Sequence, residues 1–496
     1  MSGPNSNSKN KACHNCRRRR LRCDRSHPFC HKCSRNGEEC LGYGTIIRWA
    51  NAPAVRGKMA LANATSQNNT SSLVMTKAKP LATTLSGTIQ PCLMDPLLNP
   101  LDSKSRNYMH HFTTEVCRDL VSVDQKDRNP FRAMIPLAGK VDYLQAIVVA
   151  TGAIHLAMLH NYHNGGGAGN PKLVDALVAK DKAIRCLKNA ISAATPASQQ
   201  ATILAAVVFF INFDLIDSGK GGWLTHIEAA TALMASLRKQ QLLQGLDSSL
   251  VRLVDVTAAD CLTYRILGTT ISTVDISWTD DASETEGLFD VLRRAEAHSY
   301  HCCPAAVLQI IMATSRLSQA AEKGLDKTSE ALGLLERALS FPVEEWVHSI
   351  RGLSLEDDLT VRVSLASAHR ATACLYLLLT VPDVEGLGTL SVDGLVQEVR
   401  GYLSSVPNDH VLLKGTAWPM FMAGGQTDDV EQRQWYLERL GVVWANNPFI
   451  CPWGYIRTAG EMLRELWAAM DEVSRDGKRW NCVQEMKARS VQCLIV

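Results

Sequence analysis

Apolar residues recur at every third or fourth position along most of the chain from about residue 93 to the end. This spacing puts apolar side chains on one face of an α-helix. No convincing series of alternating apolar and polar residues indicates β-strands. The pattern predicts helices at residues 108–121, 144–159, 173–191, 203–216, 226–237, 251–267, 306–317, 361–379 and 462–470.

Most of these segments are too apolar to be stable as isolated helices, so they must pack against one another in antiparallel pairs. The longest apolar run, residues 203–211, is shorter than the roughly 18 residues that a membrane span needs. It is better explained as a buried helix, and we expect no membrane association. The pattern therefore predicts one large all-α domain over residues 93–496.

The region before this domain has a different composition. Residues 1–10 are polar and predict a disordered tail, and residues 45–92 are rich in Ser, Thr, Asn and Ala, with Pro and Gly between them. We expect the latter to be a flexible linker. No sustained apolar heptad occurs between residues 41 and 81, so a coiled coil is not supported there. A monomer and a homodimer formed through the helical domain both stay open.

Residues 11–44 contain six cysteines in the pattern C-x2-C-x6-C-x6-C-x2-C-x6-C, at Cys13, Cys16, Cys23, Cys30, Cys33 and Cys40. Two tetrahedral zinc ions need eight ligands, and six thiolates supply eight if two of them bridge both metals. A single-zinc module would leave two of the cysteines without a role, and a polar start without a signal peptide argues against disulfides. The spacing predicts a binuclear cluster with two Zn2+, and metal binding would supply its folding free energy.

A run of arginines lies between the second and third cysteines, namely Arg17, Arg18, Arg19, Arg20 and Arg22. We expect a short helix there, on a rigid metal-held frame. Arginine can bond bidentately to guanine O6 and N7 in the major groove or hold phosphates. Residues 1–50 carry 11 Lys and Arg against 3 Asp and Glu, whereas the remainder carries 41 against 46. This asymmetry favours nucleic-acid binding by the N-terminal region alone.

The cysteine region resembles the fungal Zn2Cys6 binuclear cluster transcription factors, in the segments 12–17 and 40–44 and in the loop residue Pro28. The helical domain is similar to the second class of fungal-specific transcription factor regulatory domain. The segments that carry this similarity are 129–132, 135–137, 217–219, Trp223, His226, Glu228, 303–304, 418–421 and 423–424.

The resemblance implies one zinc on Cys13, Cys16, Cys23 and Cys30 and another on Cys30, Cys33, Cys40 and Cys13, with Cys13 and Cys30 bridging. It also implies that Arg20, with Arg19 beside it, recognises CGG triplets. The family often has Lys at these two positions.

The function that follows is that of a nuclear, sequence-specific regulator of RNA polymerase II transcription. It would bind CGG-containing promoter sites and work with coactivators or corepressors. The alternative is a helical interaction protein that senses an effector and binds DNA only weakly. We expect no enzyme, because no nucleophile–base motif stands out. Asp280, Asp281 and Glu284 resemble the metal-binding aspartates of class I terpene cyclases, but the segment Asn408–Asp409 lacks the second ligand set.

Three further segments are predicted to be structural. The acidic, partly apolar segment 275–290 could present an activation surface, but an exposed loop is favoured. The compact group His298, His301, Cys302 and Cys303 could hold a metal, but adjacent cysteines chelate poorly and Pro304 favours the start of a helix. The Gly-rich segment 165–169 lacks the ending of a phosphate-binding loop, so a connector is expected.

Overall fold

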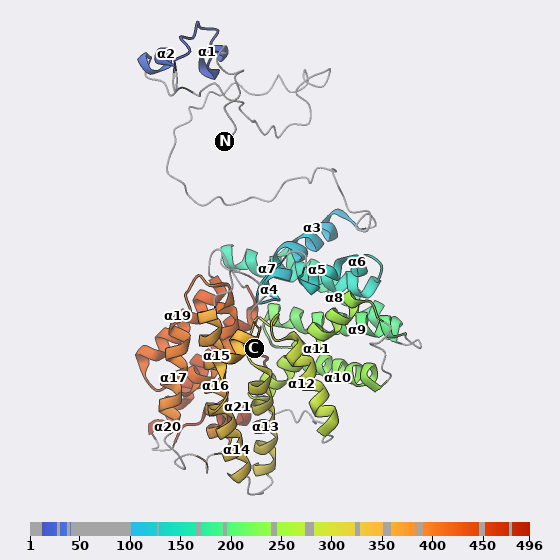
Figure 1. Ribbon diagram of the computed structural model, residues 1–496, viewed down its shortest axis with the longest axis vertical. Helices are drawn as coiled ribbons and strands as arrows, with labels where there is room; N and C mark the ends of the chain where they lie inside the picture. Colours follow the sequence, from blue (N-terminus) through green and yellow to red (C-terminus); the bar gives the residue numbers. More distant parts are fainter. Residues whose placement is uncertain are drawn as a thin grey trace. The chain divides into compact units, whose positions relative to one another are not determined.

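The chain divides into two units, Met1–Ile89 and Gln90–Val496 (Figure 1). The computed structural model describes residues 12–26, 30–36, 40, 101–125, 128–164, 170–191, 196–239, 246–272, 282–322, 328–350, 359–381, 384, 390–445, 452–475 and 479–496. The predicted tail 1–10, the predicted linker 45–92 and the segment 41–81 without heptads lie outside these residues. The first unit contains α1 (His14–Arg18) and α2 (His31–Arg35).

The described part of the second unit is built from helices, and its β-structure is one isolated antiparallel bridge between Lys220 and Cys493. The predicted mainly-α fold is therefore confirmed. The first helices are α3 (Ser103–His111), the π-helix η3 (Phe112–Val116), α4 (Cys117–Asp119), α5 (Pro130–Ala133), α6 (Ile135–Ala138), α7 (Asp142–Asn164), α8 (Pro171–Ile191), α9 (Ala197–Asp217), α10 (Trp223–Lys239) and α11 (Ser248–Thr269).

The second half of this unit continues the same architecture (Figure 1). Its helices are α12 (Ala282–Ala295), α13 (Ala305–Glu322), α14 (Thr328–Leu339), α15 (Val343–Ile350), α16 (Leu359–Thr380), α17 (Val392–Ser404), the 3-10 helix η6 (Val411–Thr416), α18 (Ala417–Gln426), α19 (Val430–Ala445), α20 (Gly454–Arg475) and α21 (Cys482–Ala488). Eight of the nine predicted helices are present as single α-helices, and most extend a few residues beyond the predicted limits; the ninth, predicted at residues 108–121, is divided among α3, η3 and α4 and ends at Asp119.

Helix α9 lies at the centre of the core and packs against α7, α10 and α11. All of its side chains from Gln200 to Ile216 are buried, so the apolar run 203–211 forms the predicted buried helix. By length and composition, α7 and α9 could each cross a membrane. However, 78% and 94% of these apolar stretches are buried inside the unit, which identifies both as core helices of this fold.

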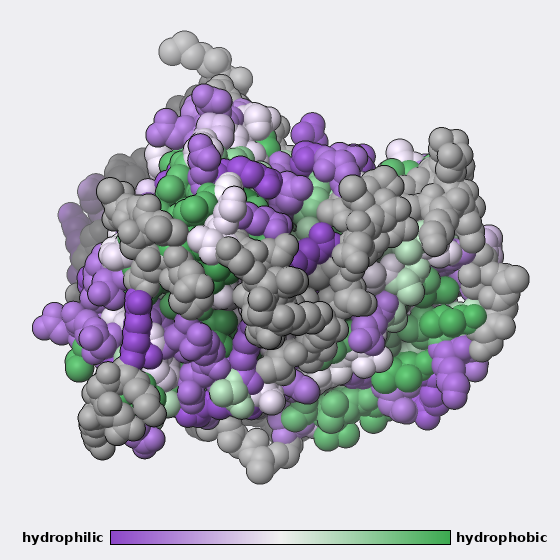
Figure 2. Space-filling model, turned by 90° about the horizontal axis from the view of Figure 1, so that it is seen from below, coloured by the Kyte–Doolittle hydropathy of each residue, from purple (hydrophilic) through white to green (hydrophobic). Residues whose placement is uncertain are grey.

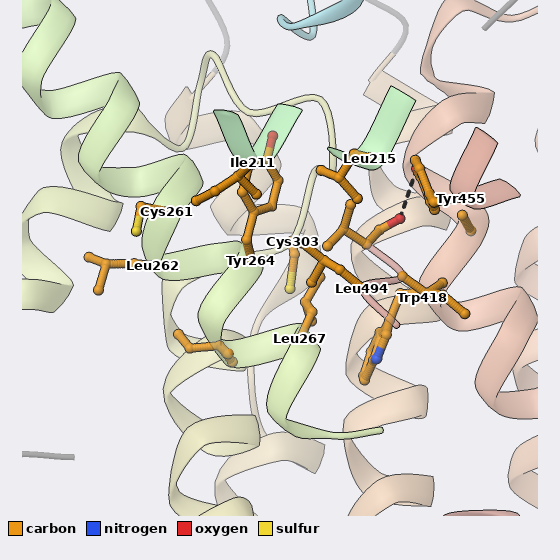
Figure 3. Packing of buried hydrophobic residues seen from close by; sticks show 14 of the residues in the cluster. Ile211, Leu215, Cys261, Leu262, Tyr264, Leu267, Cys303, Trp418, Tyr455 and Leu494 are labelled. Carbon is orange, nitrogen blue, oxygen red and sulfur yellow. Dashed lines mark hydrogen bonds between the residues drawn. The ribbon is translucent and has the colours of Figure 1, made fainter. Parts of the chain in front are cut away.

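The last residues of the chain close the core between α11, α18 and α20. Figure 3 shows Leu494 among Leu267 of α11, Trp418 of α18 and Tyr455 of α20. The N–H of Leu494 donates to the Gly219 carbonyl (2.8 Å), and the Tyr455 hydroxyl donates to the Val496 carbonyl (3.1 Å). A Cβ on Gly268 would lie 2.9 Å from the end of the Leu494 side chain and 2.9 Å from the Trp223 ring, so a larger residue would force this packing to shift.

The acidic segment 275–290 differs from its prediction. Residues 282–290 belong to α12 and are not a loop, whereas residues 275–281 lie outside the described part of the chain. Leu288 and Phe289 are buried in the core, and the burial of these apolar side chains stabilises the fold. The acids Glu286 and Asp290 pair with Arg293 on the outer face of the same helix. This half of the segment therefore does not present apolar side chains to a partner.

Helix η6 carries Lys414, a lysine whose ammonium group is buried. Its Nζ donates to the carbonyls of Arg118 (3.2 Å), Asp119 (2.7 Å) and Val121 (3.0 Å). The Asp119 carboxylate in turn accepts from His155 Nε2 (3.1 Å). Burial alone would raise the pKa of Asp119, but this hydrogen bond and the positive charges of Lys414 and Arg118 hold it below its ordinary value. These contacts join η6 to the end of α4.

Candidate metal centre and nucleic-acid interface

The two halves of the cysteine region fold in the same way. Cys13 precedes α1, and its sulfur accepts a hydrogen bond from the N–H of Cys16 (3.4 Å). Cys30 precedes α2, and its carbonyl accepts from the N–H of Cys33 (3.1 Å). In both halves a turn of helix brings two sulfurs three residues apart to one side, which is the purpose of the C-x2-C spacing.

The cysteine sulfurs lie at distances that suit zinc. Those of Cys13, Cys16, Cys23 and Cys30 are all within 4.8 Å of one another, and so are those of Cys13, Cys33 and Cys40. The separations of Cys13 from Cys33 (3.7 Å) and of Cys16 from Cys30 (3.8 Å) match the edge of a zinc–thiolate tetrahedron, about 3.8 Å. The donor set therefore fits zinc. Cys13 belongs to both groups, whereas Cys30, the second expected bridge, lies in the first.

The described residues of this unit have no aliphatic core. The buried apolar side chains are Cys13, Cys16, Cys30, Cys33 and Cys40 themselves. Burial raises the pKa of the Cys13, Cys16 and Cys33 thiols to about 12. Bound Zn2+ supplies the positive charge that keeps such thiols ionised. The stability of this small fold therefore depends on the metal.

Asp24 is a residue of this site that the sequence patterns do not predict. Its carboxylate accepts hydrogen bonds from the N–H groups of His31 and Lys32 (both 3.1 Å) and from the Ser26 hydroxyl. Asp24 thus joins the first half of the site to the start of α2.

The arginine run begins in α1 and continues beyond its end. Arg17 and Arg18 are the last residues of α1, and Arg17, Arg19, Arg20 and Arg22 are exposed, as nucleic-acid contacts must be; the Arg18 side chain lies outside the described atoms. Arg20 has a left-handed backbone (φ +55°), and the following N–H of Leu21 donates to the Cys16 carbonyl (2.9 Å). Glycine usually occupies this position after a helix, so an arginine there costs about 1 kcal/mol of backbone strain.

The other candidate sites are structural or not described. Among the described residues, groups of three or more side chains that could hold a metal occur at the N-terminal cysteines and not at residues 298–303. Cys302, Cys303 and His301 are buried at the entry to α13, as predicted. Asp280, Asp281 and the segment 165–169 lie outside the described residues, as does the side chain of Glu284.

Comparison with known proteins identifies the class to which this fold and site belong. Residues 11–50 match the fungal Zn(2)-Cys(6) binuclear cluster domain, and residues 107–492 match the fungal specific transcription factor domain. The chain therefore belongs to the fungal transcription factors that combine these two domains, as its sequence predicted. It is a transcription regulator, with a zinc-binding domain that binds DNA.

One relative aligns along nearly the whole chain. The acriflavine sensitivity control protein acr-2 of Neurospora crassa is 42% identical over 584 aligned residues, which cover 99% of this chain and 97% of that protein. No solved structure matches the chain.

Proposed function

We propose that this protein is a nuclear regulator of RNA polymerase II transcription that binds CGG-containing promoter sites through two zinc ions and the arginine run. The observation that supports this most is the joint arrangement of six cysteine sulfurs at zinc–thiolate distances and exposed arginines directly after α1. A rigid metal-held frame fixes the direction of these side chains, which sequence-specific recognition needs. The helical unit would then pass regulation on to coactivators or corepressors.

Arg20 is the residue that we assign to base recognition. Arg20→Ala is expected to weaken binding to a CGG site by about 1–3 kcal/mol and to remove much of the preference over unrelated DNA, because a bidentate bond to guanine is lost. Arg22→Ala, the matched control, should weaken binding to all sequences alike, since a phosphate contact carries no sequence information. Fluorescence anisotropy with CGG and scrambled duplexes at several salt concentrations measures both effects.

The left-handed backbone of Arg20 requires a second variant. Arg20→Gly removes the same side chain but relieves the backbone strain, so it should lose the same discrimination while the zinc-bound fold is as stable as before or more so. Equal losses on specific and scrambled DNA for both variants would refute the assignment. A weak, salt-insensitive binding of the wild-type chain to every duplex would instead favour an effector-sensing interaction protein.

We further propose that the genes under its control affect sensitivity to acriflavine. The support is that the Neurospora crassa relative is named as an acriflavine sensitivity control protein and is 42% identical along nearly the whole chain. Deleting the gene in its host should change the concentration of acriflavine that inhibits growth. Wild-type protein should restore the original sensitivity and the Cys13→Ala variant should not, whereas unchanged sensitivity in the deletion strain would contradict the proposal.

A further inference from the structure

A cavity of about 210 Å³ lies between α20, α21 and the last residues of the chain. It has room for roughly ten non-hydrogen atoms at the packing density of protein interiors. By contrast, the cavity between α11, α12 and α13 measures about 10 Å³, which is room for about one water molecule. The apolar wall of the larger cavity consists of Met462, Leu466, Met486, Val491 and Cys493.

The shape of this cavity distinguishes it from the rest of the surface. Hydrophobic residues reach the surface in several places, as Figure 2 shows for one face of the protein. An exposed apolar residue therefore does not by itself mark a binding site. In this cavity the apolar side chains form a concave wall, and charged side chains stand at its mouth. A concave apolar wall with a few polar groups is the usual form of a small-molecule site.

The mouth of the cavity carries charges of both signs. Lys220, in the loop before α10, and Arg489, directly after α21, are basic, and Glu465 of α20 is acidic; all three are exposed. Arg489 also pairs with Glu485, one helical turn earlier. The two bases and the two acids balance, so the mouth does not select a ligand of one charge. It suits a ligand that is neutral overall and carries both charges.

We propose that this cavity binds a small zwitterion with an apolar side chain, namely an apolar α-amino acid. Arg489 and Lys220 bind its carboxylate, and a guanidinium can donate two parallel hydrogen bonds to such a group. The carboxylate of Glu465 pairs with its ammonium group. The side chain of the ligand lies against the apolar wall, in which two methionines adapt to ligands of different shapes.

The position of the cavity connects ligand binding to the closing of the core. Val491 and Cys493 of its wall precede Leu494, which lies between α11, α18 and α20 (Figure 3). The isolated β-bridge joins Cys493 to Lys220. The N–H of Leu494 donates to the carbonyl of Gly219, the neighbour of Lys220 (2.8 Å). A ligand that contacts both Lys220 and Val491 therefore stabilises the attachment of the last residues, because it binds only the folded arrangement.

Such a site goes beyond the proposed function, because it lets the helical unit bind a small molecule without DNA. A failure of CGG recognition would therefore leave its measurement unaffected. The test is a ligand-observed NMR titration of the full zinc-loaded chain with leucine, 4-methylpentanoate and 3-methylbutylamine. All three probes carry the same branched apolar group. Leucine has both charged groups, whereas the second probe has only the carboxylate and the third has only the ammonium.

Leucine should bind with a Kd of about 1 mM, as expected for so small a ligand, and each other probe at least about tenfold more weakly, because it lacks one charge-assisted contact. Glu465→Gln should weaken leucine about tenfold and leave 4-methylpentanoate unchanged, whereas Arg489→Gln should weaken leucine and leave 3-methylbutylamine unchanged. Arg464→Gln is the matched control, since Arg464 is exposed on α20 but does not line the cavity, and it should bind leucine like the wild type.

Hydrogen exchange followed by mass spectrometry tests the attachment of the last residues. The C-terminal peptide that contains Leu494 should exchange about tenfold more slowly at about 10 mM leucine. A wild type that shows no saturation up to about 20 mM leucine would overturn the proposal, and so would equal or tighter binding of either single-charge probe. Unchanged leucine binding in both Glu465→Gln and Arg489→Gln, with helicity equal to that of the wild type, would place the ligand outside this cavity.

Discussion

Replacing Cys13 with alanine is expected to abolish specific DNA binding by the full chain. The sulfur of Cys13 belongs to both groups of cysteines, so its loss opens both metal sites at once. The described residues of this unit have no aliphatic core that could replace the metal. Zinc binding of about 10–16 kcal/mol is therefore the main source of its folding free energy. Without that fold the exposed arginines contact only phosphates, and at least about a thousandfold preference for the specific site should be lost.

The experiment combines zinc content by mass spectrometry with anisotropy on a CGG duplex. The wild type should hold two zinc ions per chain, and Cys13→Ala should hold fewer than one. Cys186→Ala is the control, because Cys186 is a partly buried cysteine of α8 in the other unit, and it should keep both zinc and DNA binding. The helical circular dichroism of Cys13→Ala should stay close to that of the wild type, since the helical unit has its own core. A Cys13→Ala protein that keeps two zinc ions and specific binding would contradict the proposed site.

The site was predictable where its chemistry depends on spacing. Six cysteines in two equal repeats leave few alternatives, and the structure brings all six together. Asp24 was not predictable in this way. It bonds to the start of α2 from seven and eight residues away, which no local capping pattern describes. The left-handed backbone of Arg20 was equally hidden, because arginine carries no preference for that conformation.

The helices were predicted where one face is apolar over several turns. Some amphipathic helices were nevertheless missed, although α17 shows a regular pattern at Val392, Leu395, Val396, Val399 and Leu403. In α12 the acidic composition concealed the apolar positions. A different reason applies to α18, in which nearly every side chain is buried. Such a helix has no polar face, and unlike the equally buried α9 it has only ten residues, which include Pro419, Gly424 and Gly425, so it contains no long apolar run that could reveal it.

Contacts between distant segments are the part of the structure that a single sequence does not predict. Lys414 and Asp119 are separated by 295 residues, and neither occurs in a motif. A lysine next to Leu412 and Leu413 could equally be an exposed residue at the end of an apolar segment. In the folded chain its Nζ instead binds three carbonyls at the end of α4 and lies near the Asp119 carboxylate. From this contact we predict that Lys414 stabilises the helical unit, which the sequence alone does not indicate.

Lys414→Met is expected to destabilise the helical unit by about 3 kcal/mol at neutral pH. Methionine fills a similar volume, but it leaves buried carbonyls without their donor and removes one of the cations near the Asp119 carboxylate, beside which Arg118 remains. Because the pKa of Asp119 is lowered in the folded state, this carboxylate contributes stability above its unfolded pKa of about 3.9 and loses it as the pH falls through the lower folded value. The cost of Lys414→Met should therefore shrink in acid, where Asp119 is protonated.

Urea unfolding of the full chain, followed by circular dichroism between about pH 3 and 7, measures this difference. Lys182→Met is the control, because Lys182 is exposed on α8, and its effect should stay within about 0.5 kcal/mol at every pH. Zinc content and CGG binding should not change in either variant under native conditions, since the contact lies wholly within the helical unit. If Lys414→Met unfolds at the wild-type urea concentration, the buried ammonium does not hold η6 to α4. A loss that stays constant as the pH falls would instead assign the whole effect to the carbonyls and none to Asp119.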